Sequence, residues 1–93
     1  MTTSETRAAR RAEVIARSRG DAYWYHLAIV AEVDRLASIG ELPYTVAGIA
    51  GNVRQHSGDC ARYVRELVNW GVLAYDEKGR PDWDYSGDWV TLA

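Results

Sequence analysis

The chain of 93 residues is long enough for one hydrophobic core and too short for two, so we expect one folded domain. Its net charge of −2 discourages nucleic-acid binding, and its single cysteine excludes an intramolecular disulfide and a thiolate metal cluster. No apolar run approaches the roughly 20 residues of a membrane span and no signal-peptide core follows the N-terminus, which predicts a soluble, cytoplasmic protein without a membrane partner.

The charges are unevenly distributed along the chain. Residues 1–20 carry five Arg against two Glu, and residues 54–65 carry three Arg against one Asp. Residues 66–93 reverse this balance, with six acids against Lys78 and Arg80. Two basic zones therefore lie in an otherwise acidic chain.

A first helix is predicted over residues 4–19, within an Arg-rich N-terminal arm of residues 1–20. Its apolar face is thin and consists of Ala8, Ala12 and Ile15, with Val14 and Ala16 beside them. Such a helix has little stability alone, so we expect it to dock on the rest of the chain or to fray.

A second helix is predicted over residues 21–38, with Gly40 as its stop signal. At about 100° per residue, His26, Ile29 and Val33 share its core face. A histidine at the middle of such a face is more often a core residue bonded to a carbonyl than a metal ligand, and we expect the core residue here.

The opposite side of this helix carries Trp24, Ala28, Ala31 and Arg35, where a solvated helix would carry Glu and Lys. A tryptophan beside two alanines indicates a docking groove for another apolar element. The occupant is the N-terminal helix of the same chain, that of a second copy, or another protein.

Two shorter helices are predicted next, over residues 45–54 and 58–69, with a break between them. Thr45 is a good N-cap for the first. In the second, the inward positions at 3.6 spacing are Cys60, Tyr63, Val64 and Leu67.

The remainder has strand composition interrupted by turn residues, and it predicts an antiparallel hairpin. The expected fold class is therefore mainly α with a small β-hairpin.

Residues 45–73 resemble the winged helix-turn-helix domain of bacterial transcription regulators of the MarR-like and ArsR-like kind. The resemblance rests on Thr45, Ile49–Ala50, Val53, Leu67, Gly71 and Val72–Leu73, which fall at the family's spacings without a gap. It implies a winged helix domain over residues 21–93, with the helix-turn-helix at 45–69, the wing at 72–92, and the arm as an extra N-terminal helix.

The resemblance also implies that residues 57–69 form a recognition helix lying in the major groove of DNA. The DNA-binding residues implied by position are Arg54, His56, Ser57, Asp59, Arg62, Arg65, Lys78 and Arg80. Three departures from the family pattern concern this region: Arg54 stands at a turn position that favours Gly, Gly58 has no side chain to read a base, and Asp59 is repelled by phosphate.

The predicted wing is a further departure, because acids surround Lys78 and Arg80 and alternate with Trp83, Tyr85 and Trp89. These aromatic side chains either cover the core over the sheet or form an acidic, aromatic surface that binds a protein.

No arrangement of nucleophile, base and acid, no phosphate-cradling loop and no metal-ligand spacing is present, so we expect neither an enzyme nor a cofactor. The favoured function is a sequence-specific DNA-binding regulator, acting as a dimer on double-stranded DNA. The alternative is a winged-helix protein-interaction module, such as an adaptor, a host-takeover factor or an acidic inhibitor that imitates nucleic acid.

Overall fold

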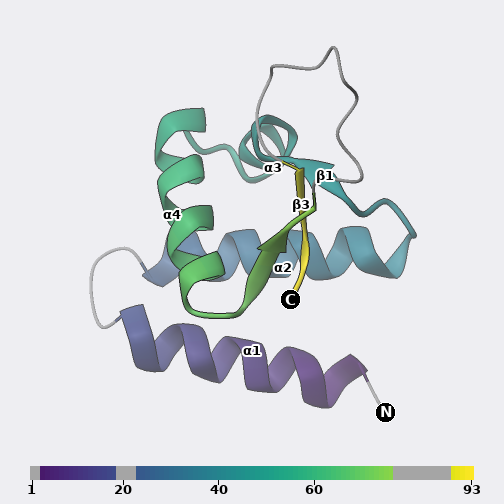
Figure 1. Ribbon diagram of the computed structural model, residues 1–93, viewed down its shortest axis with the longest axis vertical. Helices are drawn as coiled ribbons and strands as arrows, with labels where there is room; N and C mark the ends of the chain where they lie inside the picture. The colour runs from purple at the N-terminus through teal and green to yellow at the C-terminus, as the bar shows by residue number, and fades with distance from the viewer. Residues whose placement is uncertain (1–2, 19–22, 77–88) are drawn as a thin grey trace.

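The computed structural model describes residues 3–18, 23–76 and 89–93 (Figure 1). The elements, in chain order, are α1 (Thr3–Ser18), α2 (Tyr23–Ser38), β1 (Tyr44–Thr45), α3 (Val46–Val53), α4 (Ser57–Asn69), β2 (Leu73–Tyr75) and β3 (Trp89–Leu92). The four predicted helices are confirmed, with ends that differ by one or two residues. The fold is mainly helical with a small antiparallel sheet, and none of the described helices is long and apolar enough to cross a membrane.

The sheet has three strands in the order β1-β3-β2, and both pairings are antiparallel. The sequence predicted an antiparallel hairpin, and β2 does pair antiparallel with β3, with Leu73 opposite Leu92 and Tyr75 opposite Val90. The sequence did not reveal β1, because a strand of two residues shows no periodicity and this one exists through its pairing with β3. The tip of the predicted wing, including Lys78 and Arg80, lies outside the described residues.

One hydrophobic core joins α2, α3, α4 and the sheet. The four inward positions predicted for α4 are all buried, and Ile29, Val33 and Leu73 are at most 1% exposed. Tyr63 is the least buried of the four α4 residues because its ring reaches the surface, where it stacks on Tyr25 with centroids 5.5 Å apart.

Caps fix the ends of these helices as the sequence predicted. The Thr45 hydroxyl accepts a hydrogen bond of 3.0 Å from the Gly48 amide at the start of α3. Gly40 and Gly71 take positive φ angles of 73° and 77° after α2 and α4, a conformation that glycine adopts without steric cost. The Gly71 turn directs the chain from α4 into β2.

Helix α1 lies along the side of α2 that faces away from α3 (Figure 1). It does dock, but the residue that it buries, Val14, lies beside the predicted apolar face and not at its centre. Val14 is fully buried and Arg10 forms an ion pair with Asp34 of α2, whereas Ile15 is 51% exposed. The buried carboxylate of Asp34 determines this orientation, because it must be paired with a cation and Arg10 lies one turn from Val14.

The two glycines inside α3 offer a matched test of this packing. A methyl group on Gly51 would meet nothing within 4 Å, whereas one on Gly48 would lie 2.5 Å from Cε2 of Tyr44. We therefore expect Gly51→Ala to raise the free energy of unfolding by about 0.5–1 kcal/mol, through the lower chain entropy of the unfolded state. Gly48→Ala should lower it by about 1–3 kcal/mol through overpacking.

Urea unfolding of both variants beside the wild type measures the two changes. Equal effects of the two substitutions would contradict the packing of α3 against Tyr44.

The Cys60 thiol is fully buried, and burial raises its pKa to about 11 from an ordinary value of 9.0. The folded state therefore holds the thiol proton more tightly than the unfolded state does. The contribution of the protonated thiol to the free energy of unfolding is intact below pH 9 and is lost as the pH rises towards 11. We expect the wild type to lose roughly 2 kcal/mol more than Cys60→Ala between pH 8 and pH 11.

The measurement is urea unfolding of both proteins across this pH range. Parallel pH profiles for the two proteins would show that the thiol is not buried.

Candidate nucleic-acid interface on helix α4

The turn between α3 and α4 consists of residues 54–56, and it sets the direction of α4. Arg54 takes a left-handed conformation with φ 58° and ψ 44°. The Gln55 backbone amide donates a hydrogen bond of 2.9 Å to the Ala50 carbonyl of α3. The Gln55 side-chain amide donates one of 3.2 Å to the Tyr25 carbonyl of α2. The middle residue of the turn is thus bonded to both α3 and α2.

His56 is the N-cap of α4, since its Nδ1 accepts a hydrogen bond of 3.1 Å from the Gly58 amide. The sequence placed His56 among the DNA-binding residues. One ring nitrogen is occupied by the cap, which leaves Nε2 for any external contact. Ser57 and Asp59 are exposed in the first turn of α4, where Asp59 complements the helix dipole.

A continuous polar stripe runs along the outer face of α4, opposite the buried residues. Its members recur at helical spacing and are all exposed: Gly58, Arg62, Arg65 and Asn69. Arg62 and Arg65 were expected on this face. Asn69 was not selected from the sequence, although continuing the same spacing past Arg65 would have found it.

Arg62 is held in place by neighbours on its own helix. Its Nη2 donates to the Tyr63 hydroxyl at 3.2 Å, and its guanidinium carbon lies 5.0 Å from the centroid of that ring. The Asp59 carboxylate lies 3.6 Å from the same nitrogen. The Tyr63 hydrogen bond is the first cause that raises the pKa of Arg62, and the guanidinium is a cation at any physiological pH.

His26 anchors α4 to α2 from below this face. Nε2 of His26 lies 2.7 Å from a carboxylate oxygen of Glu66 on α4, a partner that the sequence did not predict. The imidazole also contacts the rings of Tyr63 and Trp70, with both centroid distances 4.9 Å. Among the described residues, no group of three potential ligands surrounds a metal position.

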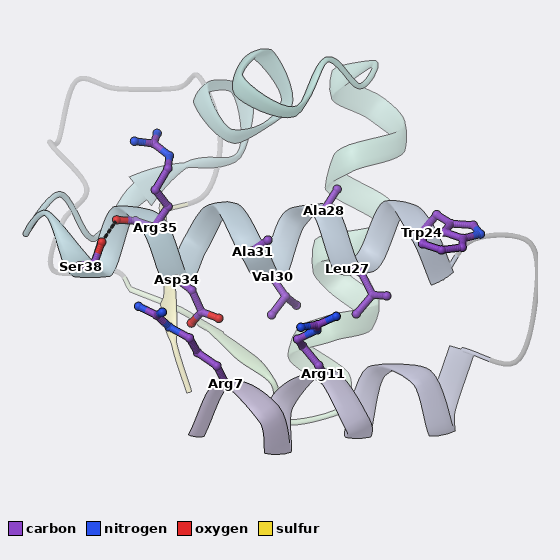
Figure 2. A pocket seen from close by; sticks show the side chains of 10 residues that line it. All are labelled: Arg7, Arg11, Trp24, Leu27, Ala28, Val30, Ala31, Asp34, Arg35 and Ser38. Atoms are coloured by element: carbon purple, nitrogen blue, oxygen red, sulfur yellow. Dashed lines mark hydrogen bonds between the residues drawn. The ribbon is translucent and has the colours of Figure 1, made fainter. Parts of the chain in front are cut away.

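A second surface lies between α1 and α2. It is a groove of about 600 Å³, and its lining contains the four residues predicted as an interface: Trp24, Ala28, Ala31 and Arg35. Figure 2 draws the side chains that line this groove. Helix α1 flanks this groove without covering Trp24, which is 66% exposed, so of the three occupants that the sequence left open, the chain's own N-terminal helix does not bury this ring. Helix α1 faces α2 through Arg10 and Val14, so it lies beside Trp24 and not over it.

Arg7 and Arg11 of α1 complete the groove, and sequence reasoning did not select them. Their spacing of four residues places them on one face of a helix, which was the signal available. Arg35 is committed to Glu32 through two hydrogen bonds of 2.9 and 2.6 Å. The hydrogen bond from Arg35 is the largest cause that lowers the pKa of Glu32, and burial opposes it.

Arg54 in the turn and Arg62 and Arg65 on the outer face of α4 are all exposed. Trp24 lines the groove between α1 and α2, which is a separate surface. Lys78 and Arg80 lie outside the described residues. No protein-family model matches this chain, and neither a curated protein nor a solved structure gives a match.

The left-handed Arg54 gives a test of the turn. A non-glycine residue in this region stores about 1–3 kcal/mol of strain, while glycine costs about 0.5–1 kcal/mol more chain entropy. We expect Arg54→Gly to raise the free energy of unfolding by about 1 kcal/mol. Arg54→Ala removes the same side chain but keeps the Cβ atom, so it should give no such gain in urea unfolding.

If Arg54→Ala stabilised the protein as much as Arg54→Gly, the effect would come from the lost charge and not from the backbone.

Proposed function

We propose that this chain is a winged helix-turn-helix DNA-binding protein, a small transcriptional regulator in which α4 enters the major groove. The order of elements supports the proposal: two helices joined by a three-residue turn are followed by an antiparallel pair of strands. In this type of domain the second helix contacts base edges and the rest of the domain contacts the backbone.

The observation that carries the proposal is the division of α4 into two faces. One face is entirely core, with Cys60, Val64 and Leu67 fully buried, while Arg62 and Arg65 project from the other. No other described element covers the outer face, as Figure 1 shows for α4 at the edge of the fold. An exposed helix with two arginines in one stripe matches the width and the chemistry of a major groove.

Each residue of the stripe has a distinct proposed role. Arg62 lies nearer the N-terminus of α4 and is oriented by Tyr63, so we assign it to a base edge, with guanine as the preferred partner. Arg65, one turn further along, is assigned to a phosphate. Gly58 lets the helix backbone approach the DNA, and Arg54, from the turn, contacts a second phosphate.

Asp59 opposes this function in a measurable way. Its carboxylate repels phosphate and lies 3.6 Å from the Arg62 guanidinium, which must partly leave it to bind a base. Asp59 therefore lowers affinity while it helps to discriminate, because only a site with a good partner for Arg62 compensates for the lost ion pair.

A protein-interaction module is the second candidate, and one observation favours it. Arg62 is already engaged by Tyr63 and Asp59 within the chain, and Glu66 lies on the same helix, so the outer face is less basic than its arginines alone indicate. Such a mixed surface suits a protein partner as well as DNA.

The test is the electrophoretic shift of a random-sequence duplex and of selected binding sites at two salt concentrations. We expect Arg65→Gln to weaken binding to all sequences and to reduce the salt slope by about 1. Arg62→Gln should cost about 1–3 kcal/mol on selected sites only. Arg17→Gln is the matched control, because Arg17 is an exposed arginine on α1 that pairs with Glu13 of its own helix.

Asp59→Asn supplies an effect of opposite sign, since it removes a phosphate-repelling charge and releases Arg62. It should tighten binding and relax the preference among sites. A wild type that shifts no duplex at low salt, or an Arg17→Gln loss as large as that of Arg65→Gln, would refute the proposal.

A further inference from the structure

The groove between α1 and α2 has an apolar floor and a basic rim. Trp24, Ala28 and Ala31 of α2 line it from one side, and Arg7 and Arg11 of α1 from the other. Figure 2 shows both arginine side chains extending from α1 towards α2. Its volume of about 600 Å³ lies within the range of small-molecule sites, which run from about 300 to 1,000 Å³.

The charges around this groove are unequally matched. Asp34 is paired with Arg10, and Arg35 is paired with Glu32. In the part of the chain that the structure describes, no carboxylate forms an ion pair with Arg7 or Arg11. Two guanidinium groups are therefore available at the rim, and they favour an anionic occupant.

The shape of the groove selects a slender occupant. Its lining on α2 runs from Trp24 to Ser38, and 14 steps of 1.5 Å give a length of about 21 Å. A helix of this length and about 10–12 Å across is much larger than the groove, so it would lie over the groove without filling it. A partner helix therefore does not enter the groove.

Two other occupants are disfavoured by chemistry. An extended peptide would bring backbone amides and carbonyls into a groove whose helical walls have their own backbone groups already bonded. A second copy of this chain, docking through the same surface by two-fold symmetry, would bring Arg7 and Arg11 of both copies into one interface, where the like charges repel. A single alkyl chain with an anionic head has neither problem.

We propose that this groove binds a single-chain amphipathic anion, with a carboxylate or similar head held by Arg7 and Arg11. The alkyl chain lies along Ala28 and Ala31, whose small side chains leave room for it, and reaches the exposed ring of Trp24. The site lies on the α1 side of α2, apart from the DNA-contacting face proposed for α4.

Isothermal titration with decanoate below its micelle concentration tests the proposal without any DNA, so its result is independent of the proposed function. We expect saturable binding at one site per chain. Decanol has the same tail without the charge and acetate has the charge without the tail, so both should bind at least tenfold more weakly. Decyltrimethylammonium should not bind.

Variants then locate the site. Arg7→Gln with Arg11→Gln should weaken decanoate binding about tenfold or more, while decanol binding is unchanged. Ala31→Leu fills the floor with a residue of similar helix propensity and should weaken both ligands. Arg17→Gln, on the same helix but outside the groove lining, is the control and should bind decanoate as the wild type does.

Circular dichroism of each variant checks that α1 remains folded. Equal affinity for decanoate and decanol, undiminished binding by the double arginine variant, or no saturable decanoate binding would each overturn the proposal. So would sedimentation showing a wild-type dimer that protects Trp24 from a soluble quencher, because the groove would then be an interface between copies.

Discussion

The contact between His26 and Glu66 is the constraint on which the candidate DNA-binding surface depends. His26 comes from the middle of α2 and is 2% exposed, and its bond to Glu66 holds α4 in a fixed rotation. The rings of Tyr63, within α4, and of Trp70, the C-cap residue of α4, both pack against the imidazole. Because one carboxylate and two rings converge on one side chain, α4 can present only one face to solvent.

The outer stripe of α4 follows from this fixed rotation. A shift of one residue would bury Arg65 or expose Leu67, and the buried side chains of the core oppose both changes. The left-handed Arg54 and the His56 cap then fix where α4 begins. The strain at Arg54 is located at the turn between the two helices, where it is offset by the Gln55 bonds to Ala50 and Tyr25.

Most of the helices could be predicted from the sequence, because caps, stop signals and apolar spacing each depend only on residues a few positions apart. Thr45 as a cap, Gly40 and Gly71 as stops, and the inward positions of α4 were all identified from propensity and spacing. The centre of the α1 face was predicted wrongly, with Val14 only beside it. The docked face depends on an ion pair across 24 residues with Asp34, and apolar periodicity carries no information about that pair. The same limitation hid β1 and the carboxylate partner of His26. Of the candidate sites, the exposed arginines of α4 were predictable, whereas the grouping of Arg7 and Arg11 with Trp24 required the packing of two helices.

The central claim is that the outer face of α4 binds DNA. Its most direct test is the titration of isotope-labelled protein with a short random duplex, followed by amide chemical shifts in NMR at low salt. The account predicts shifts concentrated in residues 54–65, which fade as salt displaces the contacts, with little change in α1. Unchanged amides across α4, or shifts confined to α1 and α2, would contradict it.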